Sequence, residues 1–169
     1  SPGPRIAKRT PAAFRIVTKG STTGICFPRR GSVEGAIQQG TGMKKILVYS
    51  HDTFGLGNIR RMLEVARHLV QSSPEVSVLV VTGSPMLHAF RIPARVDYVK
   101  LPCLSRNVEG RYGARSLAMS LEGTVRLRAN LIRSAIADFE PDLILVDKKP
   151  FGVEDELAGA LGSLPAAPK

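Results

Sequence analysis

The sequence predicts an α/β fold, in which a Rossmann-like parallel sheet carries helices on both of its faces. From residue 43 onward, short apolar runs alternate with longer segments whose apolar residues recur at helical spacing. The apolar runs are continuous, as in strands that are buried on both faces of a sheet. Strands that alternate with helices pair in parallel through right-handed crossovers, so the pattern predicts a parallel sheet covered by helices.

Four strands and two main helices account for most of the chain after residue 43. The second strand is rich in β-branched residues, and a proline leads into the fourth. A turn into a short helix precedes the third strand, a loop at 102–114 follows it, and a weaker helical segment begins near Val153. The strands are expected at residues 45–50, 76–82, 96–101 and 141–147, and the helices at residues 59–70 and from Leu117 to Phe139.

Helical periodicity also predicts which residues of the two helices face the sheet. The opposite face of the first helix carries mostly charged residues. The inward residues are expected to be Ile59, Met62, Leu63, Ala66, Leu69 and Val70 in the first helix, and Leu117, Leu121, Val125, Leu131, Ile132, Ala135 and Ile136 in the second.

The formal net charge of +10 is concentrated at the N-terminal end of the 169-residue chain. Residues 1–42 contain seven Lys and Arg and one acid, whereas residues 43–169 contain 17 basic and 13 acidic residues. Residues 1–42 are rich in Pro, Gly, Ser and Thr without a sustained period, which predicts a disordered basic extension. This segment is either a leader, tag or mis-assigned start before a natural Met43, or a genuine flexible extension. The folded domain is expected at residues 43–169.

Several broad classes of protein are disfavoured by the sequence. No apolar run approaches the roughly 20 residues of a membrane-spanning helix, and the N-terminus lacks the apolar centre of a signal peptide. Cys26 and Cys103 lie far apart and match no metal spacing, so two free thiols in a reducing cytoplasm are expected. A mildly basic domain with a basic tail suits an anionic ligand or a membrane surface as well as it suits DNA, and we expect no nucleic-acid partner.

The loop between the first strand and the first helix has the sequence YSHDTFGLGNIRR, and such loops lie where open α/β sheets bind ligands. Gly55 and Gly57 permit positive φ and a close approach of the backbone to a partner. The unpaired N–H groups at the start of the helix favour an anion, and Asn58 is a suitable N-cap. Arg60 and Arg61 oppose the helix dipole in the first turn, so an anionic partner is an attractive explanation for them.

Other phosphate-binding loops fit this segment poorly. A P-loop requires Lys followed by Ser or Thr after its glycines, and that pair is missing here. A dinucleotide fingerprint requires a third glycine where Arg60 stands, and an acid at the end of the second strand, where Thr82 and Gly83 stand.

The run KKILVYSHDTFGLGNIRRMLEVARHL resembles the N-terminal domain of glycosyltransferases with the two-domain GT-B architecture. It is similar to bacterial predicted glycosyltransferases, which are distantly similar to the family-28 enzymes that add N-acetylglucosamine to a lipid-linked precursor. The resemblance covers residues 43 to about 155 and includes PDLILVDKKPFG at 141–152. Members carry the motif S-H-D-x-x-G-x-G-H-x-R-R. The positions that agree are Ser50, His51, Asp52, Gly55, Gly57, Arg60 and Arg61.

One position departs from that motif. Asn58 stands where the family has a histidine, which is often suggested as the base that deprotonates the acceptor hydroxyl, and an amide cannot act as that base. The role of catalytic base then falls to His51 or Asp52, unless the chain is weakly active or inactive. Alternatively both residues are structural, with His51 bonded to a backbone carbonyl and Asp52 in an Asx-turn.

A second polar group follows the fourth strand. If the strand order is 3-2-1-4, the loops after strands one and four flank the switch crevice of the sheet. Asp147, Lys148 and Lys149 then face His51 and Asp52, and the two lysines can meet a phosphate or an acidic acceptor group. A solvated loop is the alternative. A basic loop after the third strand, on the acceptor side in GT-B relatives, contains Arg106, Arg111 and Arg115.

The resemblance implies a glycosyltransferase fragment that transfers a sugar from a nucleotide-sugar donor to an unidentified acceptor. In GT-B enzymes a second domain binds most of the donor, so we expect a truncated acceptor-side domain with little activity alone. No metal or other cofactor is implied. The expected partner is a small-molecule or lipid-linked acceptor, in the cytoplasm or at the inner face of the membrane. The alternative is a non-catalytic α/β module that binds a phosphorylated ligand or a partner protein.

Overall fold

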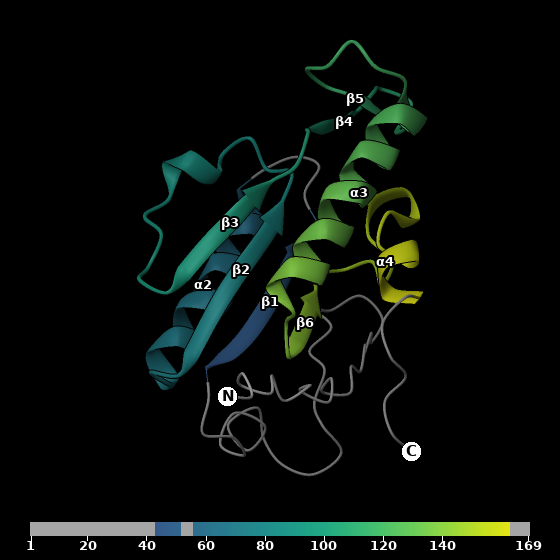
Figure 1. Cartoon of the computed structure of the whole chain (residues 1–169). Helices are drawn as coiled ribbons and strands as arrows, with labels where there is room; N and C mark the ends of the chain where they lie inside the picture. Colours follow the sequence, from purple (N-terminus) through teal and green to yellow (C-terminus); the bar gives the residue numbers. More distant parts are fainter. Residues whose placement is uncertain (1–42, 52–55, 163–169) are drawn as a thin grey trace, which may run out of the picture.

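A four-stranded sheet lies at the centre of the molecule, and all of its strands are parallel (Figure 1). The structure, a computed structural model, describes residues 43–51 and 56–162, so the extension expected at 1–42 lies outside it. The order β3-β2-β1-β6 corresponds to the 3-2-1-4 arrangement considered above, and the predicted α/β fold is confirmed. The strands are β1 Lys44–Ser50, β2 Val76–Thr82, β3 Val96–Lys100 and β6 Leu143–Val146.

Helices cover both faces of the sheet (Figure 1). They are α2 Gly57–Ser72, α3 Leu121–Phe139 and α4 Ala158–Gly162. Alternate residues of β1 point to opposite faces. Ile46 and Val48 pack in the core beneath α2, whereas Leu47 and Tyr49 pack in the core beneath α3 and α4. This alternation determines on which side of the sheet the residues after β1 lie.

Helix α2 buries the apolar stripe that periodicity predicted, and all six of the predicted residues are buried. The helix begins at Gly57, and Leu56 at its N-cap position makes no side-chain cap. The prediction that Asn58 caps the helix is therefore wrong. Asn58 lies inside the first turn, and its Nδ2 donates to the main-chain oxygen of His51 at 2.8 Å, which ties the helix to the end of β1.

Helix α3 begins four residues later than predicted, at Leu121. Its start is defined by Ser120, whose Oγ accepts a hydrogen bond from the N–H of Gly123 at 3.0 Å. At the other end, Glu140 adopts a left-handed conformation with φ of 48°, and the proline that follows cannot continue the helix.

The buried face of α3 also differs from the predicted one. Leu117, which precedes the helix, and Leu131 are 43% and 38% exposed. The prediction counted only apolar residues, and it therefore missed Arg128, which is 1% exposed. The buried residues recur at every fourth position and are Thr124, Arg128, Ile132 and Ile136.

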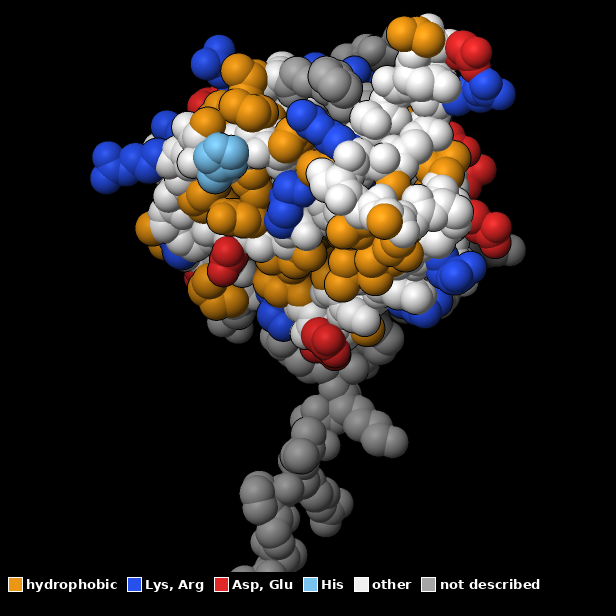
Figure 2. Space-filling view, turned by 90° about the horizontal axis from the view of Figure 1, so that it is seen from above, with side chains coloured by type: hydrophobic (Ala, Val, Ile, Leu, Met, Phe, Trp, Pro, Cys, Tyr) orange, Lys and Arg blue, Asp and Glu red, His pale blue; other side chains and the backbone are white. Residues whose placement is uncertain are grey.

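The segment expected to be a loop at 102–114 contains a small antiparallel hairpin. It consists of β4 Leu104–Arg106 and β5 Tyr112–Ala114. Asn107 Oδ1 accepts hydrogen bonds from the N–H groups of Glu109 and Arg111 at 3.1 and 2.9 Å, and Gly110 has φ of 78°. The hairpin stands at the end of the molecule towards which the strands point, which is the end seen in Figure 2.

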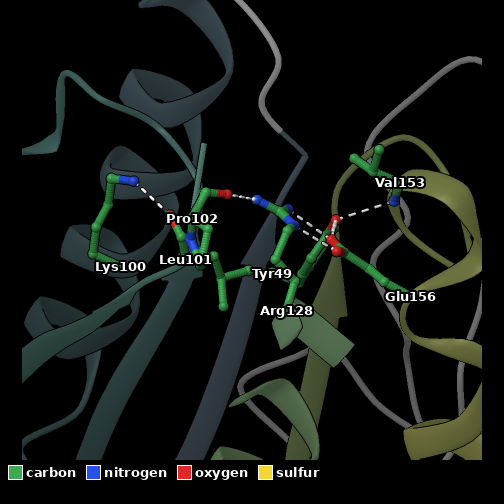
Figure 3. A network of polar contacts seen from close by, with 7 residues as sticks. All are labelled: Tyr49, Lys100, Leu101, Pro102, Arg128, Val153 and Glu156. Carbon is green, nitrogen blue, oxygen red and sulfur yellow. Dashed lines mark hydrogen bonds and ion pairs between the residues drawn. The ribbon is translucent and has the colours of Figure 1, made fainter. Parts of the chain in front are cut away.

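A buried ion pair connects α3 with the segment after β6 (Figure 3). Arg128 donates from Nε and Nη2 to the two carboxylate oxygens of Glu156, at 2.6 and 2.7 Å, and both side chains are almost fully buried. The hydroxyl of Tyr49 in β1 donates to Glu156 at 2.5 Å and accepts from the N–H of Val153 at 3.2 Å. Arg128 also donates to the carbonyl of Pro102. One network therefore joins β1, α3, the segment after β3 and the short η2 turn, Val153–Asp155.

Removing one partner of this network should destabilise the fold more than removing both. Arg128→Met leaves the Glu156 carboxylate buried without a counter-charge, so we expect the free energy of unfolding in urea to fall by about 3–5 kcal/mol. The double variant Arg128→Met/Glu156→Leu should lose less, because no charge remains buried.

The matched control is Arg126→Met, which removes an exposed ion pair between Arg126 and Glu122 on the same helix. It should change the free energy of unfolding by less than about 1 kcal/mol. Equal losses in Arg128→Met and Arg126→Met would contradict a structural role for the buried pair.

Candidate functional site

The carboxyl ends of β1 and β6 lie side by side, at the edge where open α/β sheets bind ligands. The main-chain N–H of Asp147 donates to the carbonyl of Tyr49 at 3.0 Å, so the pairing of the two strands continues past Val146. Ser50 and Asp147 therefore take neighbouring positions on the face covered by α2, and alternation places His51 on the opposite face. Figure 2 looks onto this edge and shows Lys and Arg side chains near its middle.

On the α2 side of the sheet, an ion pair connects the helix to the end of β6. Arg61 Nη2 donates to Asp147 Oδ1 at 2.7 Å, and the Arg61 side chain is 45% exposed whereas that of Asp147 is fully buried. Arg61 also donates to Asn58 Oδ1 at 3.4 Å, and Asn58 in turn holds the carbonyl of His51. The first turn of α2 is thus bound to both strand ends.

Two polar atoms at the strand ends on this side have no hydrogen-bond partner within the part of the chain that the structure describes. They are Ser50 Oγ and Asp147 Oδ2, and both side chains are buried. Burial raises the pKa of Asp147, and the charges of Arg61 and Lys148 oppose that rise. Since an unpaired buried polar atom costs about 1–3 kcal/mol, both atoms are well placed to bind a hydroxyl or a water molecule.

On the α3 side, His51 is 5% exposed, and its Nδ1 also has no partner among residues 43–51 and 56–162. Burial above all lowers its pKa to about 4, and the positive charges of Lys148, Lys149, Arg106 and Arg128 act in the same direction. His51 is therefore neutral at pH 7. Its imidazole can form hydrogen bonds with a ligand, but a pKa this far below neutrality makes it a weak base.

The backbone turns sharply after β6. Lys148 has φ of 63° and Gly152 has φ of 77°. A left-handed conformation at a residue other than glycine costs on the order of 1–3 kcal/mol and persists only where the surroundings impose it. A Cβ atom at Gly152 would lie 2.9 Å from the Tyr49 hydroxyl, so glycine is needed for this close approach. The turn leads the chain from Asp147 back to the buried Glu156, and it connects the candidate site to the network of Figure 3.

Most of the residues proposed from the sequence meet at this edge. Hydrogen bonds connect His51, Asn58, Arg61 and Asp147, and the charges of Lys148 and Lys149 act on His51. Arg60 is exposed on α2. Gly57 is helical and does not use the positive φ that the sequence suggested, although a Cβ atom there would meet nothing within 4 Å. Asp52 and Gly55 lie outside the described residues, so their proposed roles stay predictions.

Two residues of the edge received no role from the sequence. Ser50 was noted only as a position that agrees with a motif, although a polar residue that ends a buried strand is itself a signal. Tyr112 stacks under Arg106, whose Cζ lies 4.4 Å from the ring centroid, and Lys149 Nζ lies 5.9 Å from the same centroid. The sequence pointed to Tyr112 only as an aromatic residue within a basic loop.

Comparison with known proteins does not assign this site: no protein-family model matches the chain, and a search of curated proteins finds no similar sequence. Within residues 43–51 and 56–162, no group of three His, Cys, Asp or Glu side chains is arranged to hold a metal ion. None of the helices in these ranges has the length and apolar character needed to cross a membrane.

Arg61 should matter for stability mainly while Asp147 is charged. Arg61→Met leaves a buried carboxylate without its counter-charge, so we expect the free energy of unfolding at pH 7 to fall by about 1–3 kcal/mol. Asp147 then binds a proton more readily in the folded than in the unfolded chain, so the loss should shrink as the pH is lowered.

Urea denaturation at pH 7 and at lower pH measures this effect. Arg60→Met, one residue earlier and without an ion pair among the described residues, should change stability by less than about 0.5 kcal/mol. A loss for Arg61→Met that is independent of pH would show that the ion pair is not its cause.

Proposed function

We propose that this chain provides the acceptor side of a glycosyltransferase that transfers a sugar from a nucleotide-sugar donor to a hydroxyl group. The observation that carries the proposal is a set of three buried atoms without partners in the described region: Ser50 Oγ, His51 Nδ1 and Asp147 Oδ2. A ligand hydroxyl both donates and accepts hydrogen bonds, so a sugar can satisfy such atoms where an apolar ligand cannot. The resemblance of the surrounding segment to GT-B enzymes suggests sugar transfer as the chemistry.

In this reaction the acceptor oxygen attacks the anomeric carbon of the donor. The bond from that carbon to the nucleoside diphosphate breaks, and the proton of the acceptor hydroxyl passes to a base. His51 and Asp52 are the proposed bases. His51 is in the right protonation state at pH 7, since its pKa is about 4, and a bound anion would make it a stronger base by offsetting the nearby positive charges.

The start of α2 is the proposed contact for an anionic group of the acceptor. A Cβ atom added at Gly57 would meet nothing within 4 Å, and Arg60 adds a positive charge that is exposed. Arg61 is already paired with Asp147, so its role in this proposal is to hold that carboxylate beside the ligand. Gly55 belongs to the same proposed contact.

A non-catalytic module that binds a phosphorylated ligand is the second candidate function. Asn58 favours it, because an amide cannot accept a proton from a hydroxyl, and its Nδ2 is already occupied by the carbonyl of His51. The low pKa of His51 points in the same direction.

Release of nucleoside diphosphate from UDP-, GDP- and dTDP-sugars tests the proposed transfer. The full product of the natural gene is incubated with each donor and an extract of small molecules and lipids as the acceptor source. His51→Gln keeps a polar side chain but removes the imidazole, so we expect it to slow release at least about tenfold. Lys44→Met, at the opposite end of β1, should leave the rate unchanged.

Two results would contradict sugar transfer at this site. One is release that His51→Gln and Asp147→Asn both leave unchanged. The other is the lack of release from every donor while the protein still binds phosphate esters, which would favour the non-catalytic module.

A further inference from the structure

Positive charges gather near His51 on the α3 side of the sheet edge. Arg106 in β4 and Lys149 after β6 approach the same aromatic ring, that of Tyr112 in β5. Lys148, the residue before Lys149 in the chain, adds a third positive charge. Within the described ranges, none of these three cations forms an ion pair with an Asp or Glu.

The three cations are exposed, so water screens much of their mutual repulsion. The repulsion between Arg106 and Lys149, which approach one ring, grows where water is excluded. The two cations come from the hairpin and from the segment after β6, and both segments are anchored by the buried network through Pro102 and Glu156. The fold therefore holds the charges near each other, and a bound anion would remove the repulsion.

Two polar side chains supply directional contacts in addition to charge. The Tyr112 hydroxyl accepts a hydrogen bond from Arg106 Nη2 at 2.6 Å, so its own proton is available to a ligand. His51 is buried on the same side, and its Nδ1 has no partner in the described structure. This unpaired nitrogen supports a bound ligand independently of the positive charges.

We propose that His51, Arg106, Tyr112, Lys148 and Lys149, here called the hairpin cluster, bind the dianion of a phosphate monoester. A carboxylate would leave two of the three cations without compensation, whereas a phosphate dianion offers three strong acceptor oxygens to the arginine fork and the lysines. The cluster lies across the sheet edge from the start of α2, and it shares His51 with the site proposed for sugar transfer. It requires no sugar transfer, and it would serve a phosphorylated acceptor in a transferase or the ligand of a binding module.

Inorganic phosphate is the first probe, titrated into the 169-residue chain at about pH 8, where phosphate is doubly charged. We expect saturable binding that shifts the NMR signals of His51, Arg106 and Tyr112. Lys149→Met should weaken the affinity at least about tenfold, and Tyr112→Phe should weaken it several-fold. Lys44→Met removes the same charge at the other end of the sheet and is the matched control, for which no change is expected.

Two further probes distinguish the source of the phosphate. Binding of glucose 1-phosphate indicates a small soluble ester. Sedimentation with phosphatidylcholine vesicles only when they contain phosphatidic acid, lost in Lys149→Met, indicates a lipid headgroup. Either result supports the hairpin cluster.

The proposal is overturned if none of the three probes binds saturably, or if Lys44→Met weakens binding as much as Lys149→Met does. The second outcome would mean that general positive charge, rather than a site, attracts phosphate. Failure here would leave the proposed sugar transfer intact, because that reaction is measured by release of nucleoside diphosphate.

Discussion

The pairing of β1 with β6 is the constraint on which the rest of the structure depends. The pairing begins at Asp142. The Asp142 carboxylate accepts a hydrogen bond from the N–H of Lys45 at 2.8 Å, and the N–H of Asp142 donates to the Lys45 carbonyl at 2.7 Å. The pairing ends where Asp147 donates its N–H to the carbonyl of Tyr49. Because parallel strands leave the sheet at the same edge, this register brings the residues after β6 beside His51, although about a hundred residues separate them in sequence.

The buried pair of Arg128 and Glu156 acts on the same edge from within the core. A buried ion pair adds little net stability, because the cost of removing both charges from water offsets their attraction. Its effect is geometric: it draws the chain back against Tyr49 soon after β6, and it holds Pro102 before the hairpin. The left-handed turn at Lys148 lies between Asp147 and the anchored Glu156, and the anchored Pro102 lies just before the hairpin.

The sequence was sufficient for the four strands of the main sheet and for the buried stripe of α2. Continuous apolar runs identified the strands, and the stripe of α2 was predicted residue by residue. The hairpin was missed because each of its strands has only three residues, too few to show a period. Arg128 and Glu156 were missed because a charged residue is assigned to the surface unless its partner is known, and that partner is distant in sequence.

The candidate site was predictable in position but not in chemistry. Strand ends in an α/β fold indicated where His51 and Asp147 would lie, and the structure places them at neighbouring strand ends. The ion pair of Arg61 with Asp147, the stacking of Tyr112 and the low pKa of His51 depend on contacts between separate segments, which spacing in the sequence does not encode. Asp52 and Gly55 lie outside the described residues, so their positions and roles stay predictions.

The most direct test of whether this edge is a buried site among positive charges is the pKa of His51. It is measured by NMR titration of the His51 ring nitrogens, whose signals are assigned with His51→Gln. We expect a pKa of about 4 for His51 in the chain without ligand, and a partial rise when Lys148 and Lys149 are both replaced by Met, because burial is the larger cause and remains. A pKa at or above 6.5 in the unsubstituted chain would contradict this expectation, because His51 would then be solvated or paired with an acid.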